Sequence, residues 1–251
     1  MIGARARRLA AVAVGDLLDA WARDITELSA KRSCLVVAPH ADDETLGCGA
    51  AIARKVDAGR AVGILVLSDG ATWPPGQEPA TNRRIRQKEL YKAAQALGLS
   101  RSAVRQHSFP ESQLKTVAVE LGDAIADAVR ELRPEEVYTT ATGDPHPDHA
   151  AVGHAAQQVL RGSDVMLFAY PVWQWENPVS WLTVLGRGAR RPLSVSTVGY
   201  LERKREALME YRSQVSLDRE EVPHTIGPGL LSHFLGRREL LFPLAPGLGR
   251  S

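Results

Sequence analysis

The sequence predicts an α/β fold in which helices cover both faces of a mostly parallel sheet. Short runs of β-branched residues alternate along the chain with longer segments compatible with helix, and parallel neighbours require crossovers of this kind. Of the 251 residues, 44% are hydrophobic and 24% are charged, a composition typical of a globular domain with a sizeable core. Because no linker divides the chain, we expect one Rossmann-like domain.

Three stretches are expected to contribute to this domain. Residues 1–30 predict an amphipathic helix packed on the domain, because hydrophobic residues recur there at near-helical spacing: Leu9, Val12, Leu17, Leu18, Trp21 and Ile25. Residues 31–222 hold the alternating elements. Residues 223–251 are rich in proline and glycine, and we expect them to form a C-terminal extension that wraps around the same domain.

The elements of the middle stretch follow from hydrophobic runs and their stop signals. A strand over 34–37 leads to a helix over 45–58, and a second strand over 62–67 runs into the turn Ser68-Asp69-Gly70. Gly98 and Pro134 each follow a helical segment, as residues that commonly end a helix. The remaining expected elements are strands over 103–109, 136–140, 165–170 and 193–198, and helices over 81–97, 116–132, 148–160 and 200–211.

Composition excludes several classes of protein. A net charge of +2 does not indicate a nucleic-acid-binding or broad membrane-binding surface, and two cysteines exclude a disulfide scaffold. Arg7-Arg8 and the apolar run after them faintly resemble an export signal, but Asp16 and Asp19 interrupt the run. No apolar stretch approaches the ~20 residues of a membrane span. We therefore expect a cytoplasmic protein, with self-association left open.

Two clusters of histidines and carboxylates each follow an expected strand. Pro39-His40-Ala41-Asp42-Asp43-Glu44 comes after the strand over 34–37, and His146-Pro147-Asp148-His149 comes after the strand over 136–140. Open α/β sheets bind ligands at the carboxyl ends of their strands, which is where both clusters are expected. Catalytic zinc takes three protein ligands and leaves a position for water, so two histidines and one carboxylate from these clusters would suffice. The other carboxylates would remain for proton transfer.

Other interpretations of the same residues are weaker. Asp-Asp-Glu also suits an ordinary helix N-terminus, and His146 between prolines also suits a turn. Gly47-Cys48-Gly49 hints at a dinucleotide-binding loop, but Ile52 stands where the third glycine would be. Both clusters carry His beside Asp at the ends of apolar runs, and this combination favours a metal-dependent hydrolase.

The two clusters together resemble the PIG-L/LmbE family of zinc-dependent N-deacetylases. The resemblance extends to Ser68-Asp69-Gly70, to Arg86-Gln87-Lys88-Glu89 with the later Leu97-Gly98, and to the segment 204–214 that closes in Ser213-Gln214. It thus covers the chain from about Cys34 to Gln214. Two departures are mild: Ala41 replaces the usual proline, and Tyr211 stands where the family often has histidine.

Carried over by position, the resemblance implies one zinc per chain, held by His40, Asp43 and His149. It implies that Asp42 is the general base, and that a protonated His146, oriented by Asp148, assists at the carbonyl or the leaving amine. Arg86 and Asp69 are expected to contact the substrate. The implied reaction is removal of the acetyl group from an N-acetylated amino sugar or glycoconjugate. Alternatives are an amidase acting on a larger acyl or thiol conjugate with the same site, and a non-catalytic sugar- or nucleotide-binding module.

Aromatic residues concentrate between Phe168 and Trp181. Trp173 and Trp175 in this segment predict either a wall against which a sugar stacks or part of the core.

Overall fold

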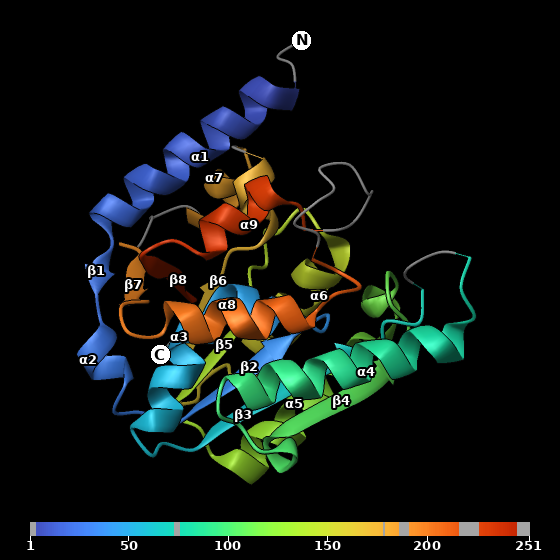
Figure 1. Ribbon diagram of the computed structural model, residues 1–251. Coiled ribbons are helices and arrows are strands. Elements are labelled where there is room, and N and C mark those ends of the chain that lie inside the picture. The colour runs from blue at the N-terminus through green and yellow to red at the C-terminus, as the bar shows by residue number, and fades with distance from the viewer. Residues whose placement is uncertain (1–3, 73–75, 178, 186–190, 216–225, 245–251) are drawn as a thin grey trace.

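The computed structural model describes residues 4–72, 76–177, 179–185, 191–215 and 226–244 (Figure 1). Within these residues, an eight-stranded sheet in the order β1-β7-β8-β6-β5-β2-β3-β4 forms the centre of the molecule. The strands are β1 (Arg23–Asp24), β2 (Cys34–Ala38), β3 (Val62–Ser68), β4 (Val104–Phe109), β5 (Glu136–Thr140), β6 (Met166–Tyr170), β7 (Leu193–Ser196) and β8 (Arg238–Leu244). The expected α/β class is confirmed.

The helices connect these strands. The α-helices are α1 (Ala4–Trp21), α2 (Thr26–Ser29), α3 (Asp43–Asp57), α4 (Pro79–Ala96), α5 (Ala118–Leu132), α6 (Pro147–Val159), α7 (Ser180–Leu185), α8 (Leu201–Glu210) and α9 (Pro228–Phe234). In the described part of the chain there are also three short 3-10 helices, η1 (Arg101–Ala103), η2 (Leu114–Val117) and η3 (Trp173–Glu176). None of the helices among the described residues is long and apolar enough to cross a membrane.

Strand β2 is the point at which the order of the sheet reverses. It pairs in parallel with β3 on one side and with β5 on the other. From β2 the chain proceeds outward to β3 and β4, whereas from β5 it proceeds in the opposite direction to β6. The helices that follow β2 and β5 therefore leave the sheet on opposite faces, and a crevice opens at the carboxyl ends of these two strands.

The two faces of the sheet bury separate hydrophobic clusters because successive side chains of a strand point to opposite sides. Val36 of β2 belongs to the cluster that also includes buried residues of α3, α4 and α8. Leu35 and Val37 belong to the other cluster, which includes residues of α5 and α6. Helices thus cover both faces, as expected.

The N-terminal helix packs through only part of the predicted face. Of the predicted apolar residues, Leu18 and Ile25 are buried, but Leu9, Leu17 and Trp21 are 63%, 71% and 45% exposed. The residues that face the domain are small, because two indole rings of the domain pack directly against the helix backbone. The ring of Trp175 lies against Gly15, and Trp181 Nε1 donates to the carbonyl of Ala11 at 3.2 Å.

The C-terminal segment is not a wrapping extension where the structure describes it. Residues 226–244 contribute α9 and the strand β8, which lies antiparallel between β6 and β7. Hydrophobic side chains of β8 such as Leu240 and Phe242 are buried in the main core. The rest of the expected extension, 223–225 and 245–251, lies outside the described residues.

Candidate metal centre and active site

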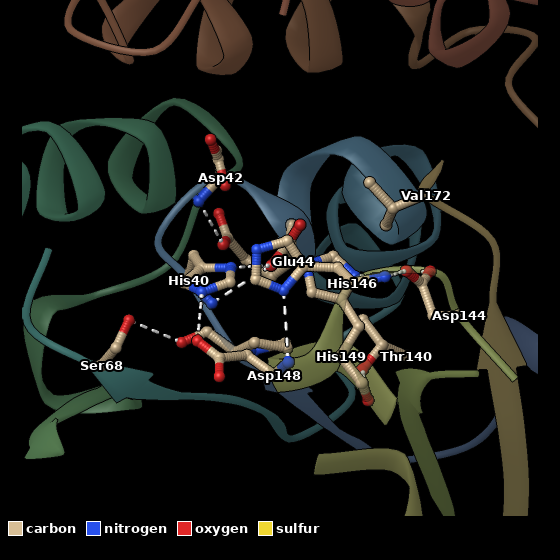
Figure 2. Close-up of polar contacts among 12 residues, drawn as sticks. His40, Asp42, Glu44, Ser68, Thr140, Asp144, His146, Asp148, His149 and Val172 are labelled. Carbon is tan, nitrogen blue, oxygen red and sulfur yellow. Dashed lines mark hydrogen bonds and ion pairs between the residues drawn. The ribbon is translucent and has the colours of Figure 1, made fainter. Parts of the chain in front are cut away.

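The crevice at the carboxyl ends of β2 and β5 holds both clusters. His40 and Asp42 lie in the loop after β2, Asp43 begins α3, and His146 precedes α6, which carries Asp148 and His149 (Figure 2). All of these residues except Asp148 line a cleft of about 320 Å³, and Asp148 contacts the ring of His40. Its described lining is His40, Asp42, Asp43, Thr72, Arg86, Glu111, Ser112, His146, His149, Val172, Trp173, Gln214 and Ile226.

His40, Asp43 and His149 converge on one point. Asp43 Oδ2 lies 3.2 Å from His40 Nδ1 and 3.3 Å from His149 Nε2. Ligands of a tetrahedral zinc with bonds of ~2.0 Å stand ~3.3 Å apart, so the spacing of these atoms fits such an ion. His149 Nε2 is also buried without a hydrogen-bond partner. The donor set and this orphaned nitrogen both fit a divalent metal.

Each of the two histidines has a second carboxylate behind it. Asp148 Oδ2 lies 3.2 Å from His40 Nε2, and Asp144 Oδ2 lies 3.5 Å from His149 Nδ1. Histidines that bind a metal almost always direct the other ring nitrogen to such a group, which fixes the tautomer and the orientation of the ring. Sequence reasoning missed Asp144. Its position shortly after β5 and two residues before His146 was the available signal.

Charges in this cluster are strongly coupled. Burial lowers the pKa of His40, but the hydrogen bonds to Asp148 and Asp43 outweigh burial and raise this pKa to about 9. Burial opposes ionisation of Asp43, yet His149 and His40 hold the pKa of its carboxyl well below the usual range. Asp43 is therefore an ionised carboxylate between two imidazoles, and a divalent cation bound there would displace imidazole protons.

Asp42 stands apart from the ligand cluster and has a strained backbone. Its φ of 131° is a conformation that side-chain-bearing residues rarely adopt. Two buried groups hold it there: Asp42 N donates to Glu44 Oε2 at 3.0 Å, and Arg86 Nη2 donates to the carbonyl of Ala41 at 2.7 Å. Burial raises the pKa of Asp42 to about 8, partly offset by Arg86, whose Nη1 lies 3.9 Å from Asp42 Oδ2.

The two departures from the family pattern are both accommodated. Ala41 needs no proline to fix the turn, because its carbonyl accepts from the buried Arg86. Tyr211 is fully buried and donates its hydroxyl to Glu44 Oε1, on the carboxylate that holds Asp42. Tyr211 therefore stabilises the loop that contains Asp42, through its hydrogen bond to Glu44.

The surroundings of His146 differ from those expected, because Asp148 orients this ring through its backbone and not through its carboxylate. His146 is the N-cap of α6, and its Nδ1 accepts from the backbone N–H of Asp148 at 3.2 Å, while the Asp148 carboxylate faces His40. A ring nitrogen that accepts a hydrogen bond carries no proton, so the neutral ring has its proton on Nε2. Burial, together with His149 and His40, lowers the pKa of His146 to about 4. In the metal-free protein the His146 ring is therefore neutral, with Nε2 as its N–H.

The four expected substrate contacts separate into two groups. Arg86 and Trp173 line the cleft, and the Trp173 ring lies 6.4 Å from that of His146 at an interplanar angle of 23°. Asp69 is not part of the described lining and instead pairs with Arg83.

Trp175 belongs to the core. It is 8% exposed and packs edge-on against Trp181 at 5.0 Å and face to face with His233 at 4.6 Å. Of the two tryptophans, Trp173 therefore lines the cleft and Trp175 lies in the core.

Comparison with known proteins agrees with this geometry. Residues 35–160, just over half of the chain, match the family described as PIG-L: GlcNAc-PI de-N-acetylase. The chain belongs to this family. The matched range contains every residue of the two clusters.

Individual relatives differ in their activities. The 1D-myo-inositol 2-acetamido-2-deoxy-alpha-D-glucopyranoside deacetylase of Kineococcus radiotolerans is 30% identical over 185 residues, 58% of this chain and 51% of that protein. The chain thus spans about half the length of that relative. The 4-oxalmesaconate hydratase of Pseudomonas putida is 25% identical over 214 residues, 75% of this chain and 80% of that protein.

Solved structures share the fold. The conserved protein TT1542 from Thermus thermophilus is 28% identical and aligns with a TM-score of 0.61 over 86% of this chain and 96% of that one.

Proposed function

We propose that this protein is a zinc-dependent N-deacetylase that removes the acetyl group from an N-acetylated amino sugar or glycoconjugate. The observation that carries the proposal is the convergence of His40, Asp43 and His149 on one point of the cleft, with Asp42 and His146 beside them. His40, Asp43 and His149 would hold one zinc ion. Bound there, the ion would supply Lewis acidity, which polarises a carbonyl and makes water acidic enough to attack near neutral pH.

Asp42 and His146 divide the proton chemistry. Asp42 accepts a proton from the attacking water and returns it to the nitrogen of the leaving amine as the C–N bond breaks. A pKa raised by burial to about 8 suits this task, because proton transfer is most efficient when the pKa lies near the working pH. His146 Nε2 donates a hydrogen bond to the acyl oxygen as negative charge develops on it.

The cleft suits a sugar-sized substrate. A volume of about 320 Å³ lies at the small end of ligand pockets, and Trp173 offers a ring at the rim next to His146. The cytoplasmic location expected from the sequence remains part of this proposal.

The hydratase relative makes water addition to a carbon–carbon double bond a second candidate, since it matches more of this chain than the deacetylase relative does. Charge in the cleft favours the deacetylase. Its described acids are Asp42, Asp43 and Glu111, while its permanent cation, Arg86, is 2% exposed and bonded to Ala41. Apart from the zinc ion itself, a carboxylate substrate would find only the Arg86 guanidinium as a permanent positive charge among these described residues.

The test is an assay of amine release from a panel of N-acetyl sugars and N-acylated conjugates, using chelator-treated protein with and without added zinc. We expect zinc-dependent release from at least one acetylated sugar. Release only from conjugates with larger acyl groups would identify an amidase. Loss of ultraviolet absorbance from an unsaturated carboxylate, without amine release, would identify a hydratase, and binding without either reaction would identify a binding module.

A further inference from the structure

A buried ion pair packs against the middle of α3, the helix that begins with Asp43, and bonds to its backbone. Lys204 of α8 and Glu239 of β8 lie 2.8 Å apart, and each side chain is 1% exposed. Figure 1 shows α8 lying alongside α3. Neither residue belongs to the described cleft lining, and the pair takes no part in the proposed chemistry.

The pair bonds to the helix backbone at several atoms. The carboxylate of Glu239 accepts from Ala50 N at 2.7 Å and from Ala51 N at 2.8 Å, and Lys204 Nζ donates to the carbonyl of Leu46 at 2.7 Å. In a regular helix, Ala50 N would donate to the carbonyl of Leu46. Here the ion pair bonds to both of these groups. The first turn of α3 is thus linked to the rest of the helix through two side chains from elsewhere in the fold.

Two glycines admit the neighbouring side chains. A Cβ on Gly47 would lie 2.2 Å from Cδ2 of Tyr170, and a Cβ on Gly49 would lie 2.9 Å from Cγ of Lys204. The Gly47-Cys48-Gly49 sequence therefore serves close packing against β6 and α8. It has no role here as a phosphate-binding loop.

We infer that Lys204 and Glu239 are positioning residues that set the direction of the first turn of α3 and hence the placement of Asp43. Asp43 and Leu46 belong to the same turn, so a displacement of the Leu46 carbonyl is transmitted to the Asp43 carboxylate within one turn. A metal site tolerates little displacement of a ligand carboxylate, because the ligand atoms must match a fixed coordination geometry. A buried ion pair is weak evidence for added stability, so control of geometry is the better explanation for it. This inference rests on the proposed role of Asp43 as a metal ligand.

The same helix provides a matched control. Lys55, near the opposite end of α3, forms a buried ion pair with Glu136 at 2.7 Å, with side-chain exposures of 1% and 0%. Lys55 lies about 18 Å along the helix axis from Asp43. Loss of this pair should destabilise the fold without moving the first turn.

The experiment measures the zinc dissociation constant by competition with a chromophoric chelator, at a temperature where each variant is folded. Lys204→Met and Glu239→Gln should weaken zinc binding about tenfold or more, as loss of groups that orient metal ligands does. Lys55→Met should lower the melting temperature about as much as Lys204→Met does, but it should leave zinc affinity unchanged. The double variant Lys204→Met/Glu239→Met removes the unpaired charge, so it should regain stability while zinc binding stays weak.

Wild-type zinc affinity in the double variant, or equal weakening in Lys55→Met, would overturn the inference while leaving the proposed metal site intact. Failure of the wild-type protein to bind zinc would overturn the metal site and this inference together.

Discussion

Strand β5 separates two buried ionic clusters with opposite character. At its first residue, Glu136 accepts from Lys55, Tyr138 and Ser29, and we call these four residues the Lys55 cluster. Beyond its last residue, Thr140, lies a second group, which we call the metal cluster: His40, Asp42, Asp43, Asp144, His146, Asp148 and His149. Both clusters contain buried charged side chains, so burial alone does not distinguish them.

Hydrogen bonding and backbone strain do distinguish them. Among the described residues, no buried side-chain atom of the Lys55 cluster lacks a hydrogen-bond partner, whereas both ring nitrogens of His149 and Asp144 Oδ2 do. Asp42 adds a backbone φ of 131°. Fully paired buried groups specify the fold, while unpaired and strained ones persist where a ligand or a reaction uses them. Variants in the two clusters should therefore fail in different ways.

The largest effect is expected from His149→Ala. Loss of a ligand should remove most of the zinc and lower kcat/KM by ~10³-fold or more, since the metal stabilises transition-state charge by several kcal/mol. The melting temperature of the metal-free protein should also fall, because the fully buried imidazole lies between the carboxylates of Asp43 and Asp144 and is their main countercharge. Elemental analysis and calorimetry measure the two quantities, and full zinc occupancy would contradict the ligand assignment.

Asp42→Asn should separate proton transfer from metal binding. Zinc content should stay near one per chain, while kcat falls by about 10²–10⁴-fold because the amide cannot accept the proton. Single-turnover kinetics on zinc-loaded protein would measure this loss. If Asp42→Asn loses zinc and Asp43→Asn retains it, the roles of the two carboxylates are exchanged.

Lys55→Met tests the other cluster. Removal of one partner leaves a buried carboxylate without its main countercharge, and the free energy of unfolding should fall by about 3–5 kcal/mol. Denaturant unfolding would measure this change. Zinc stoichiometry and KM should be those of the wild type, and a drop in either would mean that the two ends of β5 are coupled.

The pH dependence of zinc affinity is a smaller effect with a defined sign. In the metal-free protein the pKa of His40 is raised to about 9, so zinc must displace a proton from it at neutral pH. Affinity should rise with pH, about tenfold per unit for each proton released, until the pH passes about 9. Calorimetric titration in two buffers of different ionisation enthalpy counts the protons. No proton release at pH 7 would contradict the cluster as described.

The smallest effect is expected from Trp173→Ala. Loss of a ring at the rim of the cleft should raise KM several-fold, about 0.5–1.5 kcal/mol, with little change in stability. Trp175→Ala is the matched control, since removal of this buried ring should cost about 3–5 kcal/mol of stability. Steady-state kinetics and thermal unfolding of the pair would distinguish the roles, and unchanged KM in Trp173→Ala would exclude that ring from substrate binding.

Much of the fold could be predicted because its signals are local. Hydrophobic runs such as that of β2 and stop signals such as Gly98 located most elements to within a few residues. Strand β8 was not predicted, because its pairing is decided by β6 and β7, which are remote in sequence. Proline and glycine around it also weaken the local signal for a strand. The packed face of α1 was not fully predicted for a related reason. Indole rings of the domain contact the helix at Ala11 and Gly15, where larger apolar residues would not fit.

The candidate site was predictable as a set of residues but only partly as a set of contacts. Motif spacing could place His146 beside Asp148, yet the bond between them uses the backbone N–H of Asp148, a detail of helix capping. Asp144 belongs to neither motif, and although Glu44 ends the first one, the roles of both residues arise from three-dimensional contacts with His149 and the Asp42 backbone. The separation of Trp173 from Trp175 likewise depends on how η3 is oriented between the cleft and the core.

The position of β8 also has a consequence for synthesis of the protein. Translation proceeds from the N-terminus, and β8 is made after every other described strand, yet it lies between β6 and β7. Until residues 238–244 leave the ribosome, the edge of β6 has no partner, and β7 with β1 has no connection to the main sheet. Unpaired edges of this kind promote association between incomplete chains. The nascent chain therefore carries all its metal-binding motifs well before β8 can complete the sheet. A shortage of chaperones should increase association of incomplete chains during that interval.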